Sequence, residues 1–458
     1  MIGPNEVAAR AKQMEDENYA DSKSSGFLMQ GEKAMPDLCL RVTRGDATML
    51  YATFVGSYTL RIHLRMDECI DEGLMRIALD KTAKRYPYFC VSVRKNEKEV
   101  YYEENAAPVA LIHSSDAPVL ASPQSNGHIW AVSYWEDNLY IDFFHGRADG
   151  SGVYPLVATL LYYYLQERYG LANDKGIRTL EKPVTEQETH DPVDDLPLID
   201  LNTLKAVPVE PALNLMEEKK LSGVPGKGIV YRLSLPEETF IPFIKENDAT
   251  PGLMVCVLFA RAIERVIPEH AAPIVNQYIV NARPMLHAKE TFHNCTNRVV
   301  LHYDKKIRKM PLEMQGTVYR GKTFIQSDNE TIRNGMTVSG SMAQMLLDLP
   351  DLQTKVQAAG QAVGGMFKAA SFIVSYVGKW PYHQLESHML EFWTYTPAGP
   401  FPLIEVSAVN GKVFLSIMQS FEDDVFYKAF TDELKEHGLE YTEHGQSSVQ
   451  ISDMAHCS

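Results

Sequence analysis

The chain has 458 residues, of which 45% are apolar and 22% are charged. Both fractions are close to the average of soluble globular proteins, which excludes a disordered chain, a collagen-like repeat and a coiled coil. The formal net charge is −15. Because a protein that binds nucleic acid normally carries a basic surplus to neutralise phosphates, this charge argues against nucleic acid as a partner.

Residues 1–35 are polar and mixed in charge, and we expect a loosely held lead-in there without the apolar core of a signal peptide. The longest apolar stretches, Val153–Leu165 and Leu253–Phe259, are shorter than the roughly 20 residues that span a bilayer, so no transmembrane segment is expected. The cysteines are scattered without a C-x-x-C pair, which indicates reduced thiols. These features together predict a cytoplasmic protein.

Apolar patterns in the first 165 residues predict a sheet with covering helices. A helix is expected over 70–85, and from Val153 apolar residues recur at the spacing of a buried helix. The segments with the composition of strands are 56–65, 88–93, 98–104, 128–135 and 138–145. The last two are separated only by Glu136 and Asp137, which is typical of a hairpin.

Residues 181–227 hold several prolines and an acidic run without any sustained period. We therefore predict that this segment links an N-terminal lobe (1–180) to a C-terminal lobe (228–458). In the second lobe, helices are expected to begin at Glu237 and at Pro251. A further helix is expected over 355–370, and a last helix over 426–437 is expected to close the fold. The strands expected there are 228–235, 274–281, 371–378, 403–409 and 412–421. Both lobes combine a mixed sheet with helices, so the predicted class is α+β, with two-layer sandwich lobes.

The segment 143–152, FFHGRADGSG, carries the strongest local signal. It places His145, Asp149 and Gly150 at the spacing H-x-x-x-D-G, between an expected strand and an expected helix. Residue frequencies alone would produce this pattern about 0.05 times per chain. Turns that are braced by a rigid scaffold often hold reactive groups. A purely structural reading stays open, in which Asp149 caps the helix, Gly150 serves the turn and His145 is a packed histidine.

The H-x-x-x-D-G pattern resembles the active-site motif of the CoA-dependent acyltransferase superfamily. That superfamily includes chloramphenicol acetyltransferase, alcohol acetyltransferases and the condensation domains of peptide synthetases. Three further segments are similar to family motifs in the same order: VNARP (280–284), TFHN (291–294) and FIVSYVG (372–378). The resemblance covers residues 35–440 and is closest to bacterial alcohol-acetyltransferase-like proteins.

The resemblance implies two chloramphenicol-acetyltransferase-like lobes with a tunnel between them. The sequence departs from the family pattern at three positions. Phe144 stands where many members have a second histidine, His293 replaces the glycine of F-G-N, and Tyr376 replaces the asparagine of S-N-L-G. The last two positions bear on contacts to the substrate and the oxyanion.

The resemblance also implies roles for single residues. His145 would be the general base, a role that suits an imidazole because it titrates near neutral pH. Asp149 would point away from the substrate and form a structural ion pair with Arg283, unless Arg283 is an ordinary surface arginine. Gly150 would permit the tight turn at the reaction centre.

Three residues of the later segments complete the candidate site. Ser375 would donate a hydrogen bond to the oxyanion, or be an ordinary strand serine. Asn294 and Gly378 are candidates for substrate binding, with a structural role as the alternative. No metal site is expected, because His287, His293, His302 and Cys295 fit no zinc spacing.

The expected activity is transfer of an acyl group from acyl-CoA, as co-substrate, to the hydroxyl or amine of a small molecule. No permanently bound cofactor and no covalent intermediate are expected, and two lobes in one chain make a monomer the expected state. The basic run 305–309 could meet CoA phosphates or an acidic carrier protein, or be a solvated loop. Two alternatives remain: a condensation-type enzyme that takes its thioester from a separate acyl carrier protein, and a non-catalytic binding protein with the same fold.

Overall fold

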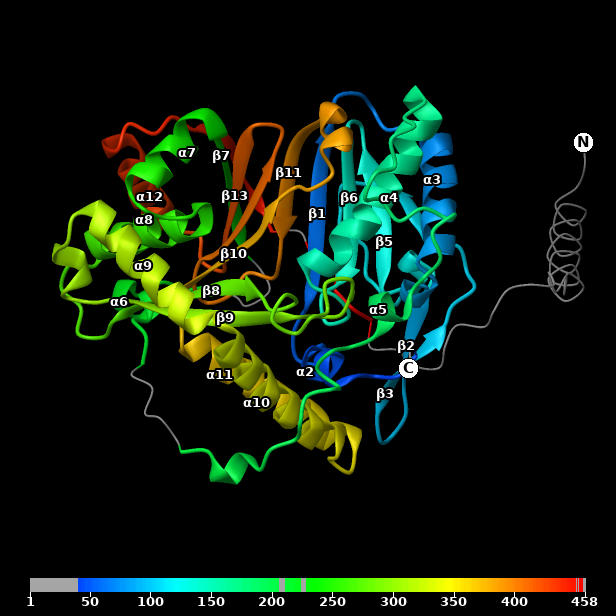
Figure 1. Ribbon diagram of the computed structural model, residues 1–458, viewed down its shortest axis with the longest axis horizontal. Helices are drawn as coiled ribbons and strands as arrows, with labels where there is room; N and C mark the ends of the chain where they lie inside the picture. Colours follow the sequence, from blue (N-terminus) through cyan, green and yellow to red (C-terminus); the bar gives the residue numbers. More distant parts are fainter. Residues whose placement is uncertain (1–39, 206–210, 224–227, 450, 452, 456–458) are drawn as a thin grey trace, which may run out of the picture. The chain divides into compact units, whose positions relative to one another are not determined.

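The computed structural model describes residues 40–205, 211–223, 228–449, 451 and 453–455. The predicted lead-in over 1–35 lies outside the described residues, as do parts of the predicted linker. The described chain has two large sheets with covering helices, which Figure 1 shows, and a small sheet of two strands. The mixed α+β class predicted from the sequence is confirmed.

The first sheet has five strands in the order β11-β1-β6-β5-β4. All neighbours are antiparallel except β4 and β5. The predicted hairpin joins β5 to β6, and its turn residue Glu136 has a φ of 54°. The strands are β1 (Thr59–Met66), β4 (Leu111–His113), β5 (Trp130–Trp135), β6 (Asn138–Phe144) and β11 (Met389–Tyr395).

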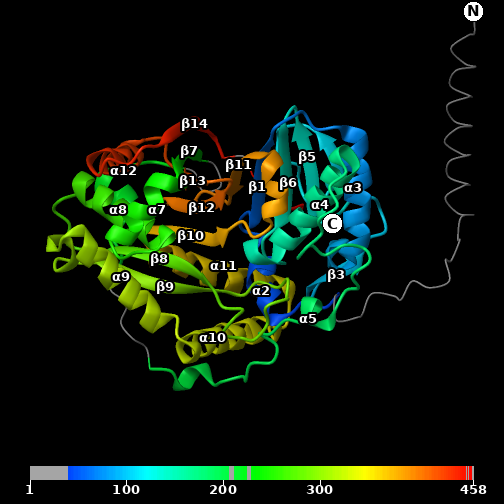
Figure 2. The same ribbon diagram turned by 45° about the horizontal axis from the view of Figure 1, so that its top comes forward.

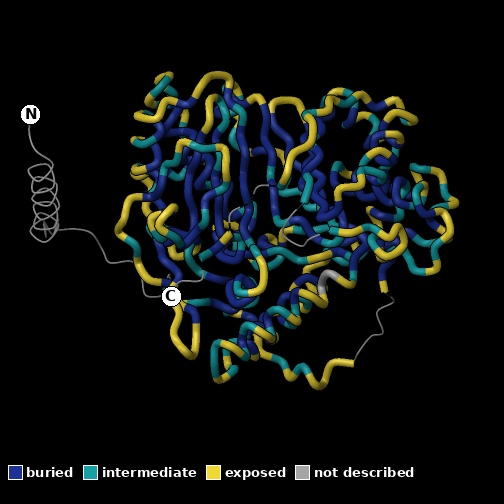
Figure 3. The backbone as a smooth tube through the Cα atoms, turned by 180° about the vertical axis from the view of Figure 1, so that it is seen from behind, coloured by how far each residue is buried: buried dark blue, intermediate teal, exposed yellow. Residues whose placement is uncertain are grey.

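Two helices, α3 (Glu72–Arg85) and α4 (Gly150–Tyr169), pack against each other beside this sheet. Helix α4 begins three residues before the predicted start at Val153, because the Asp149 side chain caps it by accepting from the Gly152 N–H at 2.9 Å. It ends at Gly170, whose φ of 72° suits a residue without a Cβ. The helix is buried from Val153 to Leu165 except at Pro155, and Figure 3 shows how buried and exposed stretches are distributed along the backbone.

The second sheet has seven strands in the order β14-β7-β13-β12-β10-β8-β9, with β10 parallel to both of its neighbours. Its apolar core is shared with α7 (Glu237–Glu246), α8 (Pro251–Val266) and α12 (Val425–Glu436). The strands are β7 (Ile229–Pro236), β8 (Ile274–Asn281), β9 (Thr296–Tyr303), β10 (Phe372–Lys379), β12 (Leu403–Val409), β13 (Lys412–Gln419) and β14 (Thr442–Ser448).

Strand β11 comes from the second half of the chain but pairs with β1 of the first sheet, with Arg61 opposite Tyr395. Figure 1 shows it between β1 and the strands of the second sheet. It was not predicted from the sequence. The domain bounds 1–180, 181–227 and 228–458 stay a prediction, to which the structure adds this exchanged strand.

Several further elements were not foreseen. Two of them are α2 (Arg44–Ala52) and α10 (Asn329–Leu347). Figure 2 shows α2 beside α10 and beside α11 (Leu352–Lys368), which corresponds to the helix expected over 355–370. The strands not foreseen are β4, β9 and β14, and the remaining helices are α9 (Leu312–Gln326) and the short α5 (Glu186–Thr189) and α6 (Leu215–Lys219) of the predicted linker.

Two sequence interpretations were wrong in detail. The predicted strand 88–93 begins as a 3₁₀ turn over Pro87–Phe89, and β2 (Val91–Lys95) starts after it and pairs with β3 (Val100–Glu104). Proline fixes its own φ and lacks an N–H, which favours the turn. Helix α12 does not close the fold, because β14 follows it and pairs with β7. Among the described helices, none has both the length and the apolarity to cross a bilayer.

Candidate functional site

The candidate site is built on the loop between the end of β6 and the start of α4. His145 is the first residue of this loop and is half-buried. Its backbone N–H donates to the carbonyl of Tyr58 at 2.9 Å, and its own carbonyl accepts from Asn294 Nδ2 at 3.5 Å. The Nδ1 atom is buried and has no hydrogen-bond partner within the described structure. The backbone of His145 is therefore held from both sides.

Asp149 closes the loop and is 2% exposed. Besides capping α4, its carboxylate forms a bidentate ion pair with Arg283 at 2.7 and 2.9 Å. Oδ2 also accepts from the backbone N–H of Cys295 at 2.9 Å. The side chain thus joins the first-sheet loop to two segments of the second half of the chain.

Arg283, which follows β8, is 3% exposed. Its guanidinium also donates to the carbonyls of Thr291 at 3.0 Å and His293 at 2.7 Å. Burial by itself would lower the pKa of Arg283, but the charge of Asp149 outweighs it and holds the pKa above its usual value. Arg283 is therefore a buried cross-brace and not a surface arginine.

Two glycines let neighbouring segments approach this loop. A Cβ on Gly150 would lie 2.8 Å from Val377 Cγ2, so the start of α4 meets the end of β10 there. A Cβ on Gly152 would lie 2.0 Å from the carbonyl oxygen of Phe292, closer than any real contact. Gly152 was not singled out from the sequence, although it stands in the same segment, and only the packing reveals its importance.

Ser375 lies on β10 opposite Glu405 of β12. Val377, two residues further along β10, faces Gly150. The Ser375 hydroxyl forms a hydrogen bond with the Glu405 carboxyl, and this bond lowers the pKa of Glu405. Burial raises the pKa by more, so that it lies at about 7. Gly378 marks an irregularity of the β10–β12 register and has a φ of 114°, in the region that favours glycine.

Asn294, which was expected to bind substrate or to be structural, contacts the loop that carries His145. Its amide nitrogen reaches the His145 carbonyl, and its amide oxygen accepts from the Thr296 hydroxyl at 2.9 Å. It is 9% exposed. The same segment connects to Arg283 through the His293 carbonyl, so the T-F-H-N segment braces the loop at two points.

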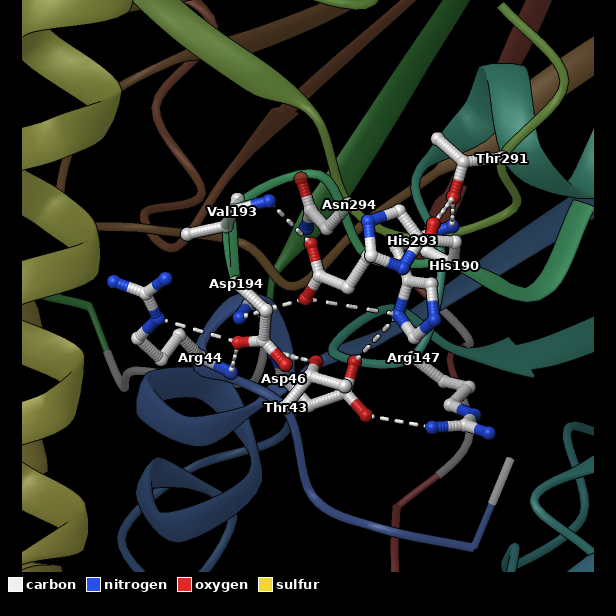
Figure 4. Close-up of polar contacts among 12 residues, drawn as sticks. Thr43, Arg44, Asp46, Arg147, His190, Val193, Asp194, Thr291, His293 and Asn294 are labelled. Atoms are coloured by element: carbon white, nitrogen blue, oxygen red, sulfur yellow. Dashed lines mark hydrogen bonds and ion pairs between the residues drawn. The ribbon is translucent and has the colours of Figure 1, made fainter. Parts of the chain in front are cut away.

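A buried charge cluster adjoins the loop and was missed by the sequence analysis (Figure 4). Asp46 of α2 accepts from Arg147 at 2.7 Å and lies 3.3 Å from His293 Nδ1. Burial would raise the pKa of Asp46, but Arg147 and His293 outweigh it, and the pKa is lowered. His293 Nε2 points to the Thr189 carbonyl at 3.1 Å. The histidine that replaces the family glycine therefore ties three segments together and is not free to bind a ligand.

In the sequence, this cluster was indicated only by Arg147, a charged residue inside the segment FFHGRADGSG. Its partner Asp46 is 101 residues away in the sequence and belongs to no motif.

Within the described ranges, no three His, Cys, Asp or Glu side chains are grouped to hold a metal ion. The basic run 305–309 follows β9, where Arg308 pairs with Glu264 at 3.1 Å.

Comparison with known proteins gives structural but no sequence relatives. No known protein family and no curated protein matches the sequence. F. graminearum TRI101, whose crystal structure holds coenzyme A and deoxynivalenol, aligns with a TM-score of 0.56 at 12% identity over 88% of this chain and 99% of its own. The starter condensation domain of rhizomide synthetase RzmA, in complex with C8-CoA, aligns with a TM-score of 0.55 at 10% identity over 87% and 93%.

The TRI3 trichothecene 15-O-acetyltransferase from Fusarium sporotrichioides aligns with a TM-score of 0.51 at 12% identity over 87% of this chain and 94% of its own. The chain has the fold of the CoA-dependent acyltransferases. At these identities the acyltransferase fold is what the comparison establishes, and the fold alone does not determine a reaction.

Proposed function

We propose that this protein transfers an acyl group from acyl-CoA to the hydroxyl or amine of a small molecule, as alcohol-acetyltransferase-like proteins do. The observation that carries the proposal is the braced loop. His145 lies at the end of β6, and the carboxylate of Asp149, four residues later, is turned away into Arg283. This arrangement fixes the backbone of the loop, while Nδ1 of the imidazole has no hydrogen-bond partner among the described residues.

In the proposed reaction, His145 takes the proton from the acceptor hydroxyl or amine as that group attacks the thioester carbonyl carbon. The tetrahedral intermediate then collapses, the carbon–sulfur bond breaks, and the imidazolium returns the proton to the departing thiolate. No bond to the protein forms. General acid–base catalysis of this kind typically contributes about 10²–10⁴ in rate.

Ser375 is the proposed oxyanion donor, and Glu405 controls whether its proton is free. A serine hydroxyl has one proton to donate. When Glu405 is ionised it accepts a hydrogen bond from the Ser375 hydroxyl, and when Glu405 is protonated its own O–H can donate to the serine oxygen. Because burial raises the pKa of Glu405 to about 7, the protonated form that frees Ser375 is well populated at neutral pH.

The test is acceptor-dependent thiol release from acetyl-, butyryl- and palmitoyl-CoA with a pool of alcohols and amines. We expect release by the wild type and its loss in His145→Ala. The matched control is His383→Ala, which removes an exposed histidine that pairs with Glu386. Release that persists in His145→Ala with unchanged folding would refute the assignment of the base.

The second candidate is a condensation-type reaction that uses a carrier-protein thioester. The similarity to a starter condensation domain favours it. Activity with acyl groups on a separate carrier protein, together with no activity from free acyl-CoA, would decide for this candidate. Binding without turnover from either donor would leave the non-catalytic alternative.

A further inference from the structure

A cavity lies between strands β1, β6 and β11 of the first sheet and strands β7 and β14 of the second. Its volume is about 260 Å³, close to the lower end of the roughly 300–1,000 Å³ of small-molecule pockets. The lining consists of Arg61, His63, Ser115, Tyr140, Val230, Arg232, Tyr395, Ser447 and Ser448. Among the described residues, none of those assigned above to the acyl-transfer site lines it.

Arg61 is the most deeply placed charge of the cavity and is 2% exposed. Its guanidinium lies 4.0 Å from the centre of the Tyr140 ring, and Nη2 donates to the Ser133 hydroxyl at 3.3 Å. Arg61 Nε lies 3.7 Å from Asp142, which is too long for a hydrogen bond, and it has no hydrogen-bond partner among the residues that the structure describes. A buried charged donor without a partner is costly, so a ligand that accepts from it would be stabilised.

Arg232 enters the same cavity from β7. Within the described part of the chain its Nε is also buried without a hydrogen-bond partner, while its guanidinium contacts the Tyr395 hydroxyl. His63 lies beside them, with Nε2 2.7 Å from Asn138 Oδ1 and Nδ1 3.1 Å from the Tyr395 hydroxyl. Burial, together with the nearby arginines, lowers the pKa of His63 to about 4, so at neutral pH this ring adds no charge.

Among the described residues that line the cavity, the charged side chains are Arg61 and Arg232, and both are cations. Asp142 lies 3.7 Å from Arg61, and Glu391 of the neighbouring strand is paired with Arg65 at 2.7 Å. A guanidinium matches the planar pair of oxygens of a carboxylate. The aromatic and apolar side chains of the lining favour an anion with an organic body over inorganic phosphate.

We propose that this cavity is a binding site for the carboxylate group of a small molecule. The unpartnered Nε atoms of Arg61 and Arg232 would donate to the carboxylate oxygens. The hydroxyls of the tyrosines and serines would supply further donors. The aromatic faces of Tyr140 and Tyr395 and the side chain of Val230 would contact an apolar body.

The test is calorimetric titration of the full chain at constant ionic strength with benzoate, its neutral isostere benzamide, inorganic phosphate and CoA. We expect one benzoate site, no comparable benzamide binding, and weaker phosphate binding. Arg232→Gln should weaken benzoate binding at least tenfold. Arg320→Gln is the matched control, since it makes the same change at an exposed arginine outside the cavity, and it should bind as the wild type does.

Two further variants keep the test decisive. The double variant R61Q/D142N removes a charge of each sign and should also weaken benzoate binding, whereas H145A should leave it unchanged even if it abolishes acyl transfer. The proposal is overturned if benzoate does not bind, or if it binds Arg232→Gln as tightly as the wild type. Tighter binding of phosphate than benzoate, or displacement of benzoate by CoA, would likewise overturn the assignment to a carboxylate ligand.

Discussion

The ion pair between Asp149 and Arg283 gives the sharpest prediction, because both partners are almost fully buried. Replacing Asp149 with alanine removes the cap of α4, the bond from the Cys295 N–H and both bonds from the guanidinium. Arg283 would keep the Thr291 and His293 carbonyls as acceptors but would lose its countercharge. The charge would then be buried without compensation.

Breaking a buried ion pair from one side typically costs about 3–5 kcal/mol, and the lost helix cap alone is typically worth about 1 kcal/mol. We therefore expect Asp149→Ala to lower the free energy of unfolding by roughly 3–5 kcal/mol. That is a large share of the roughly 5–15 kcal/mol that holds a typical domain folded. Because the same side chain fixes the His145 loop, acyl-transfer activity should fall with it.

The assay is urea unfolding followed by circular dichroism and fluorescence, in a cycle of Asp149→Ala, Arg283→Met and the double variant. Arg283→Met keeps much of the apolar stem but removes the charge, so the double variant should lose clearly less than the sum of the single losses. Glu103→Ala is the control for an exposed pair, with Arg94, and should cost less than about 1 kcal/mol. Additive losses, or a loss below about 1 kcal/mol for Asp149→Ala, would refute the reasoning.

Three further predictions concern neighbouring residues. The pKa of Glu405 is raised from 4.5 to about 7 in the folded chain, so the unfolded chain loses this proton first and stability declines as pH rises through that window. At about 1.36 kcal/mol per pKa unit, the free energy of unfolding should decline by roughly 3 kcal/mol. Glu405→Gln should abolish this decline in unfolding curves measured from pH 4 to 8. Ser375→Ala should lower kcat by about 10²–10³ with little change in stability, measured by thiol release. Gly152→Ala should drive a Cβ into the Phe292 carbonyl and cost about 1–3 kcal/mol or more in urea unfolding, whereas Gly364→Ala, in open space on α11, should cost nothing.

Each of these has a distinct contradicting result. Equal pH slopes for the wild type and Glu405→Gln would mean that the carboxyl titrates normally in the folded chain. A kcat of Ser375→Ala within threefold of the wild type would remove Ser375 from the oxyanion site. Gly152→Ala as stable as Gly364→Ala would show that the loop of Phe292 can move away.

The sequence by itself determined which local elements form. Alternating apolar residues around Glu136 and Asp137 were enough to predict the β5–β6 hairpin, and 274–281 was predicted with the bounds of β8. The FFHGRADGSG segment placed His145 and Asp149 at a junction of strand and helix, where the structure has them. These features depend on periods and turns within a few residues, which a sequence displays directly.

Which of these elements contact one another was decided only by the tertiary structure. The exchange of β11 into the first sheet, the pairing of Asp46 with Arg147 and the closeness of Gly152 to Phe292 join positions far apart in the chain. The ion pair of Asp149 and Arg283 was implied only by resemblance to a family, and its geometry came from the fold. The carboxylate cavity, which collects Arg61 and Arg232 from different sheets, left no pattern in the sequence at all. The physical reason is that burial and charge pairing depend on distances in space, which the spacing of residues along a chain does not encode.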